Sequence, residues 1–116
     1  MFLLPKSGGY VEVIKPIVAG RLPTCGIHIA DSKVSREHCL FYFEGTQLWL
    51  LDRSQNGTFV NGSKVGKNKH QELQAGDVIA IATWSARVSH VLPAGLNLIP
   101  GPANLPMETY VVGAIA

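Results

Sequence analysis

The sequence lacks any apolar run long enough to cross a membrane, so a helical membrane protein is not expected. Its opening stretch, MFLLPKSGG, is interrupted by Pro5 and is too short for the hydrophobic part of a secretory signal. Cysteine is also scarce: Cys25 and Cys39 are too few for a disulfide framework and are expected to be reduced. These shortages together predict an intracellular protein with no membrane partner.

Charge and helical periodicity are equally limited. Charged residues make up 16% of the chain and the net charge is +2, too little to indicate a nucleic-acid partner from composition. No stretch of about a dozen residues repeats its apolar positions at helical spacing. A chain of 116 residues, 47% of them apolar, nevertheless suits one domain with one core. A small globular domain without helices is therefore predicted.

Short segments that alternate apolar and polar residues, or are rich in β-branched and aromatic residues, are typical of strands. Turn-forming residues separate these segments, which favours an all-β sandwich or barrel. The expected strands are YVEVIKPIVA (10–19), GIHIAD (26–31), HCLFYFE (38–44), LWLLD (48–52), TFV (58–60), DVIAIA (77–82) and ARVSHVL (86–92).

The end of the chain has a different composition. Residues 93–106 hold four prolines and two glycines, which cannot continue a strand ladder and resemble a linker or a surface wrap. The closing METYVVGAIA could form a last strand or connect to another domain, and Thr109 within it is a speculative phosphorylation site. The expected division is a β domain over residues 1–92 and a tail over residues 93–116.

Three polar motifs fall between the expected strands: Gly20-Arg21, SREH at residues 35–38 and NGTFVNG at residues 56–62. A sandwich that gathers its loops at one end would bring a guanidinium, a hydroxyl, a side-chain amide and free backbone N–H groups together. Such a set of donors suits a phosphate, which accepts several charge-assisted hydrogen bonds. Within the third motif, Asn56-Gly57 is interpreted as a ligand loop and Asn61-Gly62 as a hairpin turn.

The order of GR, DSKVSREH, LLDRSQNGTFVNG and LQAGDVIAIA resembles the forkhead-associated (FHA) domain from about Gly20 to Ala82, with residues 1–19 as opening strands. The resemblance implies a β-sandwich of two twisted, mostly antiparallel sheets, about eleven strands in all, with ligand loops at one end. It also implies phosphothreonine recognition in partner proteins, with no cofactor and no catalytic activity.

The resemblance assigns roles residue by residue. Arg21 would reach the phosphate, Ser35 would donate its hydroxyl, Arg36 would present its backbone amide, Gln55 would line the phosphate site, and Asn56 would hold the peptide main chain. Lys33 matches a position that selects the third residue after the phosphothreonine, so an acidic residue is expected there.

Supporting residues are implied in the same way. The structural set is Gly20, His38, Gly57 and Thr58, with His38 expected to fix the serine loop rather than contact ligand. One departure is Ala82, where a glycine commonly closes the strand, which puts the following turn in doubt. A second is the basic loop expected at residues 64–71, which could extend the attraction for an acidic ligand.

Other interpretations of the same residues are weaker. Ser35, His38 and Asp52 could form a hydrolase triad, but no nucleophile elbow is present. The two cysteines and the histidines lack zinc-site spacing, so no metal is expected. The lysines at positions 64, 67 and 69 have no interleaved aromatic residues to stack bases, so they are interpreted as a solvated loop.

The sequence therefore predicts a phosphothreonine-peptide binding module, part of a larger multidomain protein in signalling, the DNA-damage response or transcription control. A nuclear location is favoured if the source is eukaryotic. The alternative is an FHA scaffold used for oligomerisation or phosphate-independent docking.

Overall fold

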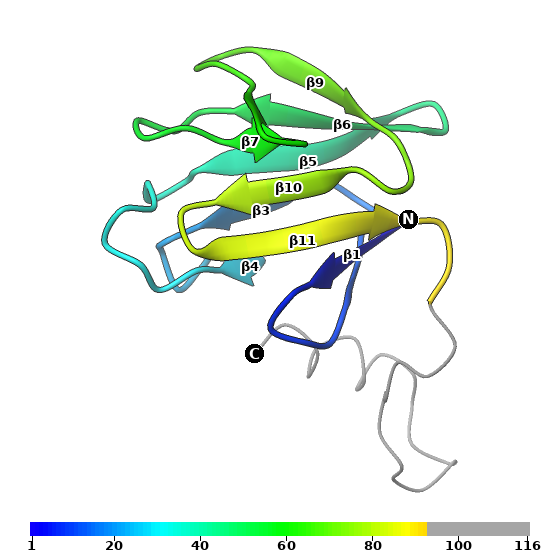
Figure 1. Cartoon of the computed structure of the whole chain (residues 1–116), viewed down its shortest axis with the longest axis horizontal. Coiled ribbons are helices and arrows are strands. Elements are labelled where there is room, and N and C mark those ends of the chain that lie inside the picture. The colour runs from blue at the N-terminus through cyan, green and yellow to red at the C-terminus, as the bar shows by residue number, and fades with distance from the viewer. Residues whose placement is uncertain (93–116) are drawn as a thin grey trace, which may run out of the picture.

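The structure is a computed structural model that describes residues 1–92, and all statements below concern this range. The described residues form eleven strands in two sheets, so the predicted all-β sandwich is confirmed (Figure 1). The six-stranded sheet runs in the order β2 (Val11–Glu12), β1 (Phe2–Pro5), β11 (Trp84–Ser89), β10 (Val78–Ile81), β7 (Phe59–Val60) and β8 (Ser63–Lys64). The five-stranded sheet runs in the order β4 (Ile27–His28), β3 (Ile17–Gly20), β5 (Cys39–Glu44), β6 (Gln47–Asp52) and β9 (His70–Leu73).

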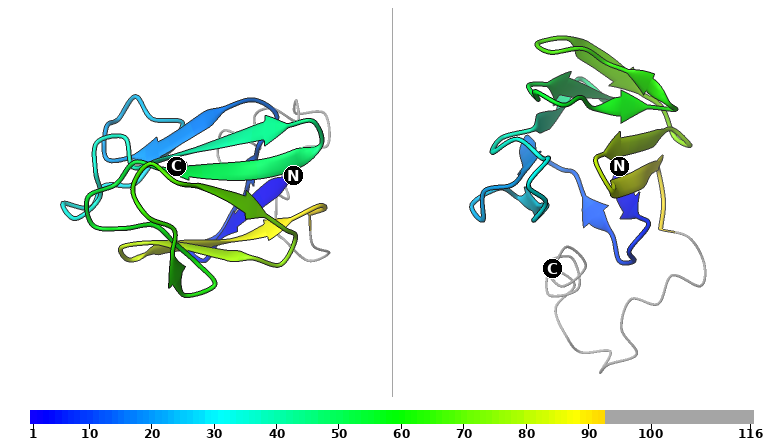
Figure 2. Two further views of the ribbon diagram at one scale, coloured as in Figure 1. Left: turned by 90° about the horizontal axis from the view of Figure 1, so that it is seen from above. Right: turned by 60° about the vertical axis from the view of Figure 1, so that its left-hand side comes forward.

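Neighbouring strands are antiparallel except for β3 and β4, which run parallel. The opening strand β1 lies between β2 and β11, and Phe2 is paired with Ser89. The beginning and end of the described domain therefore meet at one end of the six-stranded sheet. The two sheets face each other as layers, and the long loops between β3 and β5 project from the opposite end (Figures 1 and 2).

The core lies between the two sheets. Successive side chains of a strand point to opposite faces, so every second residue of a strand faces the core. In β6, Leu48 and Leu50 are buried, whereas Trp49 and Leu51 are only half-buried on the outer face. In β10, which belongs to the opposite sheet, Ile79 and Ile81 are completely buried. Burial of each such side chain stabilises the fold by roughly 1.5–3 kcal/mol, which is enough to hold the two sheets without a disulfide.

Several strand boundaries differ from the sequence prediction. The single strand expected over residues 10–19 is divided by a bend before Pro16 into β2 and β3, which belong to different sheets. The loop expected at residues 64–71 is shorter, because Lys64 ends β8 and His70 begins β9. These polar strands lack the apolar alternation from which a strand can be predicted. The predicted tail, including Thr109, lies outside the described residues.

The turns at Asn61-Gly62 and at Ala82 both contain residues with positive φ values. Asn61 and Gly62 have φ values of 53° and 82°, as a tight hairpin turn requires, so that interpretation is confirmed. Ala82 stands in the two-residue turn between β10 and β11 with a φ of 52°. The hairpin therefore closes without the common glycine, at the cost of placing an alanine in the left-handed region.

Candidate functional site

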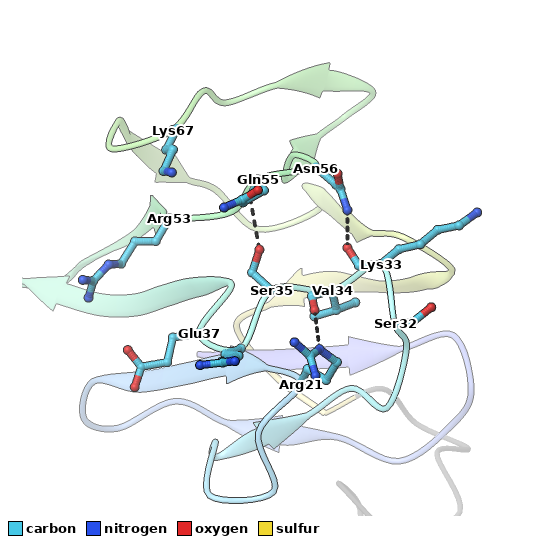
Figure 3. A pocket seen from close by; sticks show the side chains of 11 residues that line it. Arg21, Ser32, Lys33, Val34, Ser35, Glu37, Arg53, Gln55, Asn56 and Lys67 are labelled. Carbon is cyan, nitrogen blue, oxygen red and sulfur yellow. Dashed lines mark hydrogen bonds between the residues drawn. The ribbon is translucent and has the colours of Figure 1, made fainter.

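The three predicted loops meet at one groove of about 500 Å³ at the loop end of the sandwich (Figure 3). Arg21 directly follows β3, Ser35 lies between β4 and β5, and Asn56 lies between β6 and β7. The groove is lined by Arg21, Ser32, Lys33, Val34, Ser35, Arg36, Glu37, Arg53, Gln55, Asn56 and Lys67. Five of these residues are basic and one is acidic, so the groove carries a positive bias.

Gly20 allows the first two loops to approach each other. A Cβ atom at this position would lie 2.1 Å from the carbonyl oxygen of Arg36, so no larger residue fits without moving that backbone. The adjacent Arg21 N–H donates to the Ser35 carbonyl at 3.0 Å, and the guanidinium Nε donates to the Val34 carbonyl at 3.0 Å. These bonds hold the arginine over the serine loop and leave its terminal NH₂ groups without partners in the described part of the chain.

His38 connects the serine loop to the asparagine loop. The Ser35 N–H donates to Nδ1 of the buried ring at 3.0 Å, so Nδ1 acts as an acceptor. Nε2 therefore carries the ring proton and donates to the Gly57 carbonyl at 3.0 Å. His38 is thus hydrogen-bonded to both loops and does not line the groove.

Ser35 has a hydroxyl that remains able to donate to a ligand. Its Oγ accepts a hydrogen bond from the Gln55 N–H at 3.1 Å, which leaves the hydroxyl hydrogen unassigned to any protein acceptor within residues 1–92. The Arg36 N–H is likewise without a partner in that range, while the Arg36 carbonyl accepts from the Leu22 N–H at 3.3 Å. A hydroxyl and a backbone amide therefore lie on the same short loop, close to Arg21.

A buried carboxylate organises the loop that contains Asn56. Oδ1 of Asp52 accepts from the Ser54 N–H at 2.9 Å, the Ser54 hydroxyl at 2.7 Å and the Thr58 hydroxyl at 2.9 Å. The Ser54 Oγ in turn accepts from the Gly57 N–H at 2.9 Å, and Gly57 has a φ of 107°. Thr58 therefore contacts the same carboxylate that organises this turn. Sequence reasoning missed the part played by Asp52 and Ser54, although an Asp-x-Ser pattern is a turn signal.

The Asn56 side chain reaches from its own loop to the serine loop. Its Nδ2 donates to the Lys33 carbonyl at 2.7 Å, which ties the asparagine loop to the serine loop a second time. The other Nδ2 hydrogen and Oδ1 remain without partners in the described range, so they are available to a peptide backbone.

All six residues expected to bind ligand line the groove: Arg21, Lys33, Ser35, Arg36, Gln55 and Asn56. The four expected supporting residues are Gly20, His38, Gly57 and Thr58, and none of them lines it. Sequence reasoning did not identify Arg53, Glu37, Ser32 or Val34 as lining residues. Lys67, which was assigned to a solvated loop, also lies at the groove.

The hydrolase interpretation does not agree with these contacts. Both ring nitrogens of His38 are hydrogen-bonded to backbone groups, so neither can take a proton from the Ser35 hydroxyl. Asp52 accepts from Ser54 and Thr58 rather than from the imidazole. In residues 1–92, no group of three or more His, Cys, Asp or Glu residues is arranged to hold a metal ion. No helix in this range is long and apolar enough to span a membrane.

A two-layer sandwich whose end loops form a positively biased groove defines a β-sandwich binding module. Comparison with known proteins gives its family: residues 17–82 match the model of the FHA domain, and the chain belongs to this family.

Among similar proteins, the serine/threonine-protein kinase RAD53 of Saccharomyces cerevisiae is 42% identical over 64 residues, which are 53% of this chain and 8% of that protein. The E3 ubiquitin-protein ligase CHFR of Danio rerio is 41% identical over 63 residues, which are 52% of this chain and 10% of the ligase. The chain thus matches only about a tenth of the length of these relatives.

A solved structure gives the same result in three dimensions. The N-terminal FHA domain of S. cerevisiae Rad53p, in complex with a phosphothreonine peptide, superimposes with a TM-score of 0.68 and 27% identity. The match covers 74% of this chain and 89% of that domain.

Proposed function

We propose that this chain is a binding module that recognises phosphothreonine in partner proteins. The observation that carries the proposal is the meeting of Arg21, Ser35 and Asn56 at one groove, on loops that His38 and Gly20 hold together. The similar domain of Rad53p in complex with a phosphothreonine peptide supports the same function.

Each group has a specific role in this proposal. The terminal nitrogens of Arg21, the Ser35 hydroxyl and the Arg36 N–H donate to phosphate oxygens, Gln55 lines the phosphate site, and Asn56 holds the peptide main chain. A hydrogen bond to a charged group contributes about 1.5–3 kcal/mol net. Several such bonds, less the cost of ordering the peptide, lead to about 8 kcal/mol, or micromolar affinity.

Lys33 is proposed to select an acidic residue three positions after the phosphothreonine. Its N–H donates to Oδ1 of Asp31 at 2.9 Å and its carbonyl accepts from Asn56, so the backbone is held while the side chain extends from the rim (Figure 3). A peptide series should bind better with Glu than with Leu at this position, and Lys33→Gln should remove the preference. Equal binding of both peptides by the wild type would contradict this role.

The proposed setting follows from the family and from the relatives. Residues 1–92 act as one domain of a larger intracellular protein in phosphorylation-dependent signalling or the DNA-damage response, nuclear if the source is eukaryotic. In this proposal the described domain binds and does not catalyse, because both ring nitrogens of His38 are bonded to backbone groups and cannot act as a base on the Ser35 hydroxyl.

The test is titration of a phosphothreonine peptide library, with unphosphorylated copies, against the wild type, Arg21→Gln and Ser35→Ala. The matched control is Arg87→Gln, which loses the same charge on β11 of the other sheet. Phosphate-dependent binding that only the groove variants weaken, by at least about ten-fold, supports the proposal. Binding of phosphorylated and unphosphorylated peptides alike, or self-association alone, would favour the scaffold alternative.

A further inference from the structure

The groove has a second positively charged side that the phosphothreonine assignment does not use. Arg53 and Lys67 lie on one side of Ser35 in the close-up view, and Lys33 lies on the other (Figure 3). We call the side made by Arg53 and Lys67 the Arg53–Lys67 flank. It is built from the end of β6 and the connection between β8 and β9, so it is separate in sequence from the loops of Arg21 and Ser35.

The backbone holds both residues of the flank in place. The Arg53 N–H donates to the His38 carbonyl at 2.9 Å, which holds the backbone of Arg53 against the backbone of His38. Asp52, one residue earlier, donates from its N–H to the Lys69 carbonyl at 3.0 Å and accepts from the Asn68 N–H at 2.6 Å. The turn that contains Lys67 is thus bonded directly to the residue preceding Arg53.

This turn is itself a defined structure rather than a loose connection. The Lys69 N–H donates to the Gly66 carbonyl at 3.1 Å, and Gly66 and Asn68 have φ values of 104° and 65°. Lys67 occupies the position between these two left-handed residues. Lys67 is therefore held at the groove by a turn in which two residues adopt the left-handed conformation.

Within residues 1–92, no acidic side chain neutralises the charges of the flank. Arg53 and Lys67 are exposed, and neither side chain has a hydrogen bond or an ion pair in the described part of the chain. Among the described residues, Glu37 is the only acidic one that lines the groove, while Arg21 and Arg36 also line it and add positive charge. Like charges held at one groove repel each other, so the arrangement adds nothing to folding and favours an anion.

We propose that the Arg53–Lys67 flank binds a second anionic side chain of the same peptide, on the side of the phosphothreonine away from Lys33. The inference rests on the proposed function and extends it: the ligand is a phosphothreonine peptide with a further carboxylate or phosphate. Guanidinium binds either group with paired hydrogen bonds, and the lysine adds a point charge. This chemistry does not depend on the residue selected by Lys33.

The experiment uses a phosphothreonine peptide that the wild type binds, with glutamate scanned through three positions on each side in an otherwise neutral sequence. A second series places phosphothreonine or phosphoserine at the best position, which distinguishes a carboxylate from a phosphate. The proteins are the wild type, Arg53→Gln, Lys67→Gln and Lys33→Gln, with Arg87→Gln as the control of equal charge loss.

One glutamate position should raise wild-type affinity by about three- to ten-fold. Arg53→Gln and Lys67→Gln should abolish that gain, with a clearly smaller effect on the neutral peptide than on the acidic one, and added salt should reduce the gain. Lys33→Gln should remove the gain from glutamate at a different peptide position, and Arg87→Gln should leave the gain unchanged at every position. Thermal unfolding of the two flank variants should match the wild type because both side chains are exposed.

Two results would overturn the inference while leaving the proposed function intact. Either no glutamate position responds to Arg53 or Lys67, or both variants weaken neutral and acidic peptides equally. A wild type that binds no phosphothreonine peptide would overturn the proposed function, and the inference with it.

Discussion

The backbone N–H of Ser35 points at Nδ1 of His38 across 3.0 Å, so a buried imidazole sets the conformation of the loop that carries the proposed phosphate ligand. The opposite ring nitrogen bonds to Gly57 in the neighbouring loop. One side chain thus determines the distance between two segments that are about twenty residues apart in sequence.

Replacing His38 by Ala should destabilise the domain by about 2–4 kcal/mol, because it leaves the part-buried Ser35 N–H and the buried Gly57 carbonyl unpartnered and removes a buried ring. Chemical denaturation would measure this loss, with His28→Ala, on the exposed side of β4, as the control. Nitrogen NMR of the wild-type ring should find the proton on Nε2. A ring protonated on Nδ1 alone would contradict the hydrogen-bond assignment.

Gly20→Ala should displace the Ser35 loop, because the added methyl group would lie 2.1 Å from the Arg36 carbonyl oxygen. We expect a loss of about 1–3 kcal/mol in stability, together with weaker binding of a phosphothreonine peptide. Gly45→Ala is the control: that glycine has a φ of 63° but open space around it, so binding should be retained. Unchanged stability and affinity of Gly20→Ala would show that the loops can separate freely.

Ala82→Gly should stabilise the domain by about 0.5–1 kcal/mol. The left-handed conformation at this position costs alanine about 1–2 kcal/mol, and part of the gain is offset by the greater entropy of glycine in the unfolded chain. Thermal unfolding would measure the change, and peptide affinity should stay constant because the turn is not a lining segment of the groove. A destabilised variant would mean that the alanine is not strained.

Cys39 should make stability fall at alkaline pH. Complete burial raises the pKa of its thiol above the ordinary value of 9.0, and Asp52 raises it further. Since the folded state holds this proton more tightly than the unfolded state, the contribution is complete below about pH 9 and decreases as pH rises above it. The slope of unfolding free energy against pH above this point should be smaller in Cys39→Ala.

A thiol reagent tests the same burial directly. The half-buried Cys25 should react in the native protein, whereas Cys39 should react only after unfolding. Rapid reaction of both thiols in the native state would contradict the buried position of Cys39.

The fold class and the groove could be predicted from sequence because their signals are local. Turn residues such as Asn61-Gly62 and the alternation in β5 and β6 are visible within a few positions. The motifs around Arg21, Ser35 and Asn56 stand in loops, and a sandwich gathers such loops at one end. Their individual roles in binding remain predictions.

The features that could not be predicted from sequence depend on contacts between distant segments. Position 20 requires a glycine because a Cβ atom there would collide with the carbonyl oxygen of Arg36, and no local sequence pattern reveals this contact. Likewise, Lys67 reaches the groove because its turn bonds to the backbone of Asp52. β8 and β9 are polar strands that form by pairing with β7 and β6, so their own residues carry little β signal.

The pairing of Phe2 with Ser89 has a consequence for how such a module is used in a longer chain. Both ends of the described domain, residues 1 and 92, lie at the end of the sandwich remote from the loops of the groove (Figure 1). Fusion of a partner protein at residue 1 or residue 92 should therefore leave the access of a peptide to the groove unobstructed.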